Sequence, residues 1–369
     1  MNNYSIFRIS ILYGIYKNLS WYFILLFIAG NISCGKTKTY SIKLENEVNI
    51  VNNYKPLYKN KFALKKLFNF GKELGTPWDL TVDLDENIYV FDQGYSDVKK
   101  YDSEGKFIKV FGRKGVGPGE LQEMSYIFFI PEDKIYIKGP FTNKIIVFNV
   151  DGKYLKDIKT KYNVDVYPYG GRYFISGIED PSSNYLFMTY DVERNILNKF
   201  CKPLLVEGYR YNNLVNISEL VFDKEGNIYV CFNHQNRIEK YSKEGDLEIK
   251  IDRTLTSKME FSYEGERILE YKDKKISVPN PKVTNFSSHI GIDNKNRLWI
   301  LTYQKQPTDS MEAFKFFWIE VYDEKGILLD RVTYPEKHMQ IFKVFNNRIY
   351  LYDFDQYEQG ISVYEIIEY

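Results

Sequence analysis

One pattern recurs along this chain of 369 residues and restricts its fold more than any other feature: a turn followed by a short strand centred on an aromatic residue. The pattern occurs six times, and its central residues are Tyr89, Tyr136, Tyr173, Tyr229, Trp299 and Tyr350. Their separations are 47, 37, 56, 70 and 51 residues. Repeats of this length are typical of β-propellers, in which each repeat forms one blade.

The first copy shows what one repeat contains. It has four apolar runs, "WDLTVD", "NIYVFD", "DVKKYD" and "FIKVFG", which we name strands a to d. Apolar and polar residues alternate in them, and Gly, Asp and Asn separate them, which indicates strands joined by turns. We therefore predict an all-β chain that folds as a six-bladed β-propeller with four-stranded antiparallel blades.

The last copy lacks a d strand, because the chain ends at Tyr369 with strand c. The segment "FALKKLFNFG" (Phe62 to Gly71) precedes the first copy and is similar to the d strand "FIKVFG". We predict that it completes the last blade, so that an N-terminal strand closes the ring and no open junction remains between the chain ends.

The N-terminus has the features of an export signal. Arg8 and Lys17 precede the apolar run "WYFILLFIAG" (Trp21 to Gly30), which is too short to span a bilayer comfortably. The following "NISC" resembles the lipobox of bacterial lipoproteins, in which Cys34 would be lipidated, although Asn31 replaces the commoner Leu. An uncleaved helical anchor and a plain secretory signal are the alternatives.

These features divide the chain into a signal peptide (1–34), a tether (35–60) and the propeller (61–369). The two remaining cysteines, Cys201 and Cys231, lie in apolar strand-like segments. We interpret them as small buried hydrophobic residues. A disulfide between them is the alternative, because export leads to an oxidising compartment.

Two segments resemble NHL-type six-bladed propellers. They are "FGRKGVGPGELQ" (Phe111 to Gln122) and "CFNHQNRIEKYSKEG" (Cys231 to Gly245), the second of which contains the NRI motif of that family at Asn236 to Ile238. Together with the lipobox, the chain resembles the six-bladed propeller lipoproteins of Bacteroidetes-like bacteria. The resemblance implies a binding platform, with some enzymatic relatives, and fold alone does not decide between them.

Loop lengths differ between the two ends of the blades. The a–b and c–d turns are short, whereas the b–c and d–a connections hold every long insertion; we call the end that carries them the long-loop face. The largest insertion is 253–285, in which we expect "ERILEY" to form a short helix of a lid. Binding residues concentrate on loops held by a rigid scaffold, so we expect ligand contacts on this face.

Aromatic and polar residues of the long-loop face are the candidate contacts, since they offer large contact areas and polar tips. The predicted ligand-binding residues are Trp78, Tyr95, Phe141, Tyr209, Arg210, Tyr211, His234, His289, Tyr303 and Lys305.

The three histidines support an alternative hypothesis. His234, His289 and His338 all map to the long-loop face, where Asp92, Asp353 and Asp355 could add oxygen ligands. This set would suit a divalent metal in the pore and a metal-dependent hydrolase or lactonase. Local capping of the b–c loops is the simpler role for these Asp residues. No GxSxG, HExxH or phosphate-binding GK[ST] motif is present.

The favoured prediction is a membrane-anchored lipoprotein that binds an envelope protein, peptide or glycan through its long-loop face, without catalysis or a cofactor. We expect a monomer on the outer membrane, facing the periplasm. A net charge of +1 gives no electrostatic footprint for nucleic acid. A purely structural envelope component is a further alternative that the sequence does not separate from the first.

Overall fold

The structure of the chain is a computed structural model, and residues 39–369 form one compact unit in it. The residues that it describes are 39–121, 126–130, 133–139, 143–159, 165–169, 172–176, 184–191, 195–209, 211–271, 274–306, 315–337, 341–352 and 360–369. Among them, no helix is long and apolar enough to cross a membrane.

The unit is all-β and six-bladed, as the repeat predicts: five blades are four-stranded antiparallel sheets, and the sheet of blade 4 gains β1 and β2 as two further strands. Blade 1 consists of β4 (Pro77–Val82), β5 (Ile88–Asp92), β6 (Asp97–Tyr101) and β7 (Phe107–Phe111). Blade 2 consists of β8 (Tyr126–Ile130), β9 (Lys134–Lys138), β10 (Lys144–Asn149) and β11 (Tyr154–Lys159). Blade 3 consists of β12 (Asp165–Tyr169), β13 (Arg172–Ser176), β14 (Phe187–Tyr190) and β15 (Ile196–Phe200).

Blades 4 to 6 follow the same order, except that the last strand of blade 6 precedes blade 1 in the sequence. Blade 4 contains β16 (Ser218–Phe222), β17 (Ile228–Phe232), β18 (Ile238–Tyr241) and β19 (Leu247–Arg253). Blade 5 consists of β22 (Ser287–Ile292), β23 (Leu298–Tyr303), β24 (Phe317–Tyr322) and β25 (Leu328–Thr333). Blade 6 consists of β26 (Ile341–Phe345), β27 (Arg348–Tyr352), β28 (Ile361–Glu368) and β3 (Phe62–Phe70).

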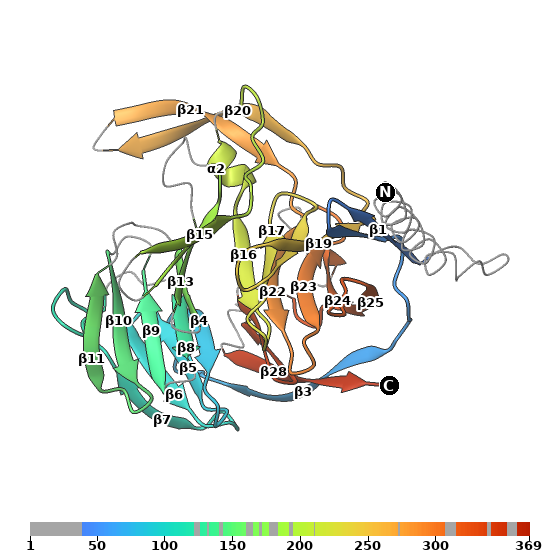
Figure 1. The fold of residues 1–369 in the computed structure, drawn as a ribbon. Helices are drawn as coiled ribbons and strands as arrows, with labels where there is room; N and C mark the ends of the chain where they lie inside the picture. Colours follow the sequence, from blue (N-terminus) through green and yellow to red (C-terminus); the bar gives the residue numbers. More distant parts are fainter. Residues whose placement is uncertain are drawn as a thin grey trace, which may run out of the picture. The chain divides into compact units, whose positions relative to one another are not determined.

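The first strand of each blade is the innermost one. Of these strands, β4, β8, β16 and β22 lie towards the middle in Figure 1, and contacts join β4 to β8 and β26, β8 to β12, and β22 to β16 and β26. Apolar side chains of adjacent blades form shared clusters. Tyr89, Tyr229, Trp299 and Tyr350 are fully buried in them. The repeated aromatic residue therefore exists because it fills the space between two sheets.

In blades 1, 4 and 5 an Asp closes the turn that precedes the aromatic strand. Asp83 Oδ1 accepts hydrogen bonds from the backbone N–H groups of Asp85 and Asn87, which closes the a–b turn. Its other oxygen accepts the Tyr89 hydroxyl at 2.9 Å. In blade 5 the Trp299 Nε1–H donates to Asp293 in the same way, also at 2.9 Å. The Asp and the aromatic residue of one repeat therefore act as a pair.

The N-terminal part of the unit runs along three blades. Residues 35–60 were expected to be a tether, but β1 (Tyr40–Glu45) and β2 (Val48–Asn53) form a hairpin, and β2 pairs in parallel with β19 of blade 4. The hairpin is ordered because Val51 is fully buried between blades 4 and 5. The chain then hydrogen-bonds to Leu328 and Leu329 of blade 5, and β3 pairs antiparallel with β28.

The expected helix in the insertion 253–285 is absent. The segment "ERILEY" belongs to β20 (Phe261–Tyr271), which pairs antiparallel with β21 (Lys274–Val283) to form a separate hairpin. Six residues are too few to stabilise an isolated helix, whereas the strand finds a partner inside the same insertion. Among the described residues, a single α-helical turn, α2 (Asn212–Val215), precedes blade 4.

Cys201 and Cys231 are both free and buried, as the interpretation of small hydrophobic residues requires. Burial, with the nearby Glu239 carboxylate, raises the pKa of the Cys201 thiol to about 12. Burial also raises the pKa of the Cys231 thiol to about 11. Neither thiol is therefore a reactive thiolate at neutral pH.

Candidate functional site

Charged side chains from four blades meet in the channel that the innermost strands enclose. Asp79, Glu219 and His289 occupy the same level of strands β4, β16 and β22, since each is paired with the same position of the second strand: Phe91, Cys231 and Leu301. Lys343 joins them from β26 of blade 6. We call these four residues the channel cluster. It lies near the start of the first strands, which is the long-loop end.

Two ion pairs organise the channel cluster. His289 Nδ1 lies 2.7 Å from Glu219 Oε1, and Lys343 Nζ lies 2.9 Å from Asp79 Oδ1. Each carboxylate also accepts a backbone N–H from the innermost strand of the next blade: Asp79 from Ile127 at 3.0 Å, and Glu219 from Ile290 at 3.4 Å. The same side chains therefore line the channel and join neighbouring blades.

Three members of the channel cluster are accessible from the channel. The exposed fractions of the side chains are 33 % for Glu219, 22 % for His289 and 31 % for Lys343, whereas Asp79 is buried at 5 %. Glycine at position 291 lets blade 6 approach closely, because a Cβ there would lie 2.5 Å from Val344 Cγ2. This approach brings the strand that carries Lys343 against the strand that carries His289.

Burial and pairing act differently on the ionisable groups. Burial raises the pKa of Asp79 despite the adjacent Lys343. Burial also opposes ionisation of Glu219, but the charge and hydrogen bond of His289 outweigh it, so the pKa of Glu219 is lowered. Burial would lower the pKa of Lys343, yet the charges of Asp79 and Glu219 raise it. At neutral pH Glu219 is therefore a carboxylate and Lys343 an ammonium ion.

Two of the predicted aromatic residues are exposed on the long-loop face of blade 1. Trp78 directly precedes Asp79 and is 50 % exposed, and Tyr95 is 59 % exposed. Lys99 Nζ lies 4.4 Å from the Tyr95 ring centroid and also pairs with Asp92 at 3.0 Å. Asp92 accepts the backbone N–H groups of Gly75, Thr76 and Gly94, so it caps the loops on both sides, as the simpler hypothesis expects.

Other predicted residues hold the insertions in place. Tyr209 and Tyr211 pack against Tyr263 of β20, with ring centroids 5.2 and 6.1 Å from it, and thereby hold the β20–β21 hairpin. His234 Nδ1 lies 3.4 Å from the carbonyl oxygen of Thr284. Tyr303 packs against Phe316 and Phe317.

Of the remaining predicted residues, Lys305 is exposed. Five positions lie outside the described residues: Phe141, Arg210, His338, Asp353 and Asp355.

The described residues contain no group of three or more His, Cys, Asp or Glu side chains arranged to hold a metal ion. His289 is bonded to Glu219, and His234 is directed at a backbone carbonyl. The metal-site hypothesis therefore gains no ligand set from the part of the chain that the structure describes.

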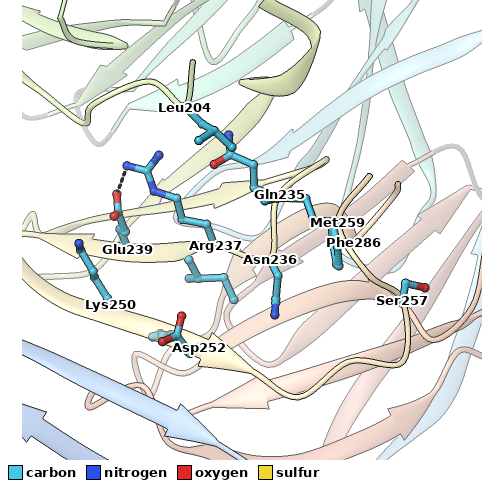
Figure 2. Close-up of a pocket in the computed structure, with 12 residues that line it drawn as sticks. Leu204, Gln235, Asn236, Arg237, Glu239, Lys250, Asp252, Ser257, Met259 and Phe286 are labelled. Atoms are coloured by element: carbon cyan, nitrogen blue, oxygen red, sulfur yellow. Dashed lines mark hydrogen bonds and ion pairs between the residues drawn. The ribbon is translucent and has the colours of Figure 1, made fainter. Parts of the chain in front are cut away.

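A cavity of about 470 Å³ opens at the long-loop end of blade 4, between Leu204, the turn before β18, and residues 257–259 (Figure 2). Two charged residues that line the cavity bind other groups of the protein. Arg237 pairs with the buried Glu239 at 2.7 Å and donates to the Lys202 carbonyl at 2.9 Å. Lys250 and Asp252 also line the cavity.

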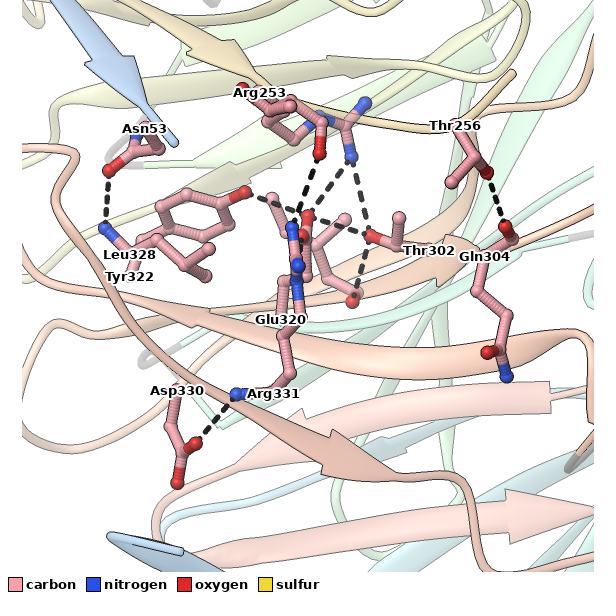
Figure 3. Close-up of polar contacts among 12 residues, drawn as sticks. Asn53, Arg253, Thr256, Thr302, Gln304, Glu320, Tyr322, Leu328, Asp330 and Arg331 are labelled. Carbon is pink, nitrogen blue, oxygen red and sulfur yellow. Dashed lines mark hydrogen bonds and ion pairs between the residues drawn. The ribbon is translucent and has the colours of Figure 1, made fainter. Parts of the chain in front are cut away.

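A buried network lies behind this cavity and joins blades 4 and 5 (Figure 3). Arg253 donates to Asn236 at 2.9 Å and lies 3.5 Å from Glu320, and the Arg253 and Glu320 side chains have no exposed area. Tyr322 and Arg331 also donate to Glu320, at 2.7 and 2.9 Å. Removing one member of such a network is costly, so we assign it a structural role.

Sequence analysis found His289 and Trp78 but missed Asp79, Glu219 and Lys343. Asp79 and Glu219 could have been found by aligning the a strands "WDLTVD", "SELVFD" and "SHIGID", because the alignment places Asp79, Glu219 and His289 in one column. Lys343 had no such signal, because it lies one level further along its strand, opposite Tyr350.

Comparison with known proteins gives the fold but no activity. The model of the family DUF5128, described as a 6-bladed beta-propeller, matches residues 79–285. A member of the duf4221 family from Bacteroides vulgatus is similar in structure, with a TM-score of 0.58 and 10 % identity over 85 % of this chain and 100 % of that chain. A candidate exported protein of Bacteroides fragilis has a TM-score of 0.57 and 12 % identity, over 87 % and 99 %. No curated protein sequence matches the chain.

The Glu219–His289 pair predicts a pH-dependent contribution to stability. A carboxyl whose pKa is lower in the folded state stabilises it above the unfolded value, here 4.5, and this contribution is lost as the pH falls through the folded value. At pH 7, Glu219→Gln should lower the melting temperature by a few degrees, as for a loss of about 1 kcal/mol in a partly exposed pair. Thermal melts between pH 7 and pH 3 should show this difference shrinking. Glu225→Gln, at an exposed position, is the control. If the difference in melting temperature between Glu219→Gln and the wild type stayed constant with pH, the pH-dependent contribution assigned to the Glu219–His289 pair would be wrong.

Proposed function

We propose that this chain, which belongs to the 6-bladed beta-propeller family DUF5128, binds a polar ligand at the long-loop mouth of its channel. The observation that carries the proposal is the channel cluster, in which Glu219, His289 and Lys343 remain accessible although they come from three different blades. A peptide or a glycan is the ligand class that such a site suits, because both combine hydrogen-bonding groups with surfaces that stack on aromatic rings.

Two exposed aromatic rings of the long-loop face, Trp78 and Tyr95, support this class of ligand. Trp78 adjoins Asp79 in β4, and half of its surface is open to solvent. Tyr95 is held in place by Lys99, which in turn is fixed by Asp92 and Asp97. Rings held in this way lose little conformational entropy when a ligand stacks on them.

We place the protein in the cell envelope, attached through lipid on Cys34 and facing the periplasm. The lipobox-like "NISC" and the preceding apolar run support this location. Only five positions separate Cys34 from Thr39, the first described residue, and β1 begins at Tyr40. The attachment is therefore short, since the segment expected as a tether contributes strands to blade 4. The NHL-type relationship stays a prediction.

We further propose that the pairing of β3 with β28 closes the ring. The ends of β3 pack on both neighbouring blades: the Phe62 ring lies 5.5 Å from Trp299 of blade 5, and the Phe70 ring lies 4.8 Å from Tyr101 of blade 1. Eight residue pairs join β3 to β28.

Ligand binding can be followed through the change in emission of Trp78, because among the other tryptophans of the described residues Trp299 is fully buried and Trp318 is partly buried. Soluble muropeptides and chito-oligosaccharides, titrated into the full chain in detergent, should change the tryptophan emission and protect it from acrylamide. Trp78→Phe should abolish the signal, and Lys343→Met should weaken binding by about tenfold or more, as expected for a charged hydrogen-bonding partner. Binding of neither probe to the wild-type chain would contradict the proposal.

Lipidation predicts that Cys34→Ser moves the protein from the membrane fraction to the soluble fraction, because no acyl chain can then be attached. The readouts are fractionation and incorporation of labelled palmitate in a bacterial host. Ser33→Ala is the matched control, since it keeps a small residue before the Cys and should leave the protein in the membrane fraction. Equal membrane retention of the Cys34→Ser protein without label would argue for a different anchor.

Ring closure by β3 predicts a large loss of stability on truncation. A chain that begins at residue 72 lacks β3 and should melt at least about 10 °C lower, since two buried Phe side chains are lost at several kcal/mol each. A synthetic peptide of residues 61–71 should restore the melting temperature in a concentration-dependent manner. A chain that begins at residue 55 keeps β3 and should lose less. Identical melting of the two truncated chains would refute the proposal.

A further inference from the structure

The Glu219–His289 pair has the geometry of a proton-transfer centre. We propose that His289, positioned by Glu219, acts as a general base that activates water to hydrolyse a carboxylic ester bound at the channel mouth. This inference rests on the proposed function, because it uses the same mouth, and it adds a chemical activity and a substrate class to ligand binding.

The orientation of the imidazole is the first support. The 2.7 Å contact to Glu219 Oε1 places the ring proton on Nδ1, which donates to the carboxylate. The lone pair then resides on Nε2, and within the described part of the chain Nε2 has no hydrogen-bond partner. The imidazole is 22 % exposed, so water can reach it. A carboxylate that fixes one ring nitrogen and leaves the other free is the arrangement of a catalytic base.

The carboxylate itself is held by neighbouring structure. Glu219 Oε2 accepts the backbone N–H of Ile290, the residue that follows His289. Glu219 lies on β16 of blade 4 and His289 lies on β22 of the adjacent blade 5, so the packing of the two blades fixes their separation. Glu219 is therefore a positioning residue, and His289 is the group that would contact the reacting atoms.

Lys343 supplies the charge that an ester hydrolysis needs. Its ammonium group pairs with Asp79 and also interacts electrostatically with Glu219, the partner of His289. An ammonium group has three N–H donors, and Asp79 accepts one of them at 2.9 Å. A carbonyl oxygen that received another of these donors would be stabilised as negative charge developed on it.

The groups around His289 leave it with one carboxylate partner among the described residues. The strands packed against β22 are β16, β17, β23 and β26. The ionisable groups on these strands include Glu219 on β16, Cys231 on β17, Tyr303 on β23 and Lys343 on β26, and of these Glu219 contacts the imidazole directly. No other charged group in this set competes with Glu219 for the imidazole.

The substrate class follows from what the base lacks. No described hydroxyl or thiol lies within hydrogen-bonding distance of Nε2, so the nucleophile is water rather than a side chain. Imidazole-activated water is sufficient for an ester, whose alkoxide leaves readily, whereas an amide requires stronger activation of the leaving amine. We therefore assign an ester of a carboxylic acid, such as an O-acyl group carried by a glycan.

The reaction balances with water as the second substrate. His289 Nε2 takes a proton from water as the water oxygen bonds to the ester carbonyl carbon, and the carbonyl electrons move to the oxygen facing Lys343. The tetrahedral intermediate collapses, the carbon–alkoxide bond breaks, and imidazolium returns the proton to the leaving alkoxide. The products are a carboxylic acid and an alcohol, and His289 is neutral again.

The test uses the full chain in detergent with two probes, p-nitrophenyl acetate and O-acetylated chito-oligosaccharides. We expect release of p-nitrophenol from the first probe and of acetate from both. His289→Ala and His289→Gln should lower kcat by about 10²–10⁴-fold, the usual contribution of a general base. Glu219→Gln should lower kcat by about 10–100-fold with little change in KM, as for other carboxylate–histidine pairs.

Controls separate catalysis from folding and from binding. Glu225→Gln makes the same chemical change at the opposite end of blade 4 and should leave kcat unchanged; thermal melts show whether each variant is folded. A folded His289→Gln protein with wild-type turnover would overturn the inference, as would wild-type protein that binds chito-oligosaccharides through Trp78 but releases no acetate. In the second case the proposed function stands, whereas absence of both binding and turnover defeats both proposals.

Discussion

The constraint on which this structure depends is that each four-stranded sheet has two apolar faces and no helix layer to cover them. Each face is therefore buried against the neighbouring sheet, and six sheets satisfy this condition together. Tyr89, Tyr229 and Trp299 are fully buried between blades for this reason. The short turns follow from the same need, since Asp83 and Asp293 fix both the turn and the aromatic residue after it. In these repeats the blade is thus specified locally, before any long-range contact forms.

The same arrangement creates the candidate site. Each innermost strand pairs with a neighbouring strand on one edge only, so the backbone N–H groups on its other edge need different partners. Asp79 and Glu219 provide them across the gap to the next blade. Each carboxylate also accepts a side-chain donor, Lys343 of blade 6 for Asp79 and His289 of blade 5 for Glu219. The carboxylates that accept these backbone hydrogen bonds, together with their side-chain partners, therefore also place charged groups on the accessible lining of the channel.

The sequence predicted the repeat architecture well because its signals are local. Period-2 alternation and Asp-rich turns depend on neighbouring residues, and they located the blades. Two hairpins were missed for the opposite reason. Val51 is ordered by contacts with blades 4 and 5, some 200 residues away in the sequence, and "ERILEY" by its pairing with residues 274–279. The partnership of Lys343 with Asp79 joins the last blade to the first, so no sequence pattern near either residue could indicate it.

The pairing of β3 with β28 has a consequence for how the chain is made. Phe62 and Glu368 are partners, as are Phe70 and Ile361, so about 300 residues separate the two strands. At ribosomal rates of roughly 5–20 residues per second, β3 waits about 15–60 s for its partner to be synthesised. Throughout that interval blade 6 is incomplete and its neighbours keep an uncovered face. A chain with this topology can complete blade 6 only after β28 has been synthesised.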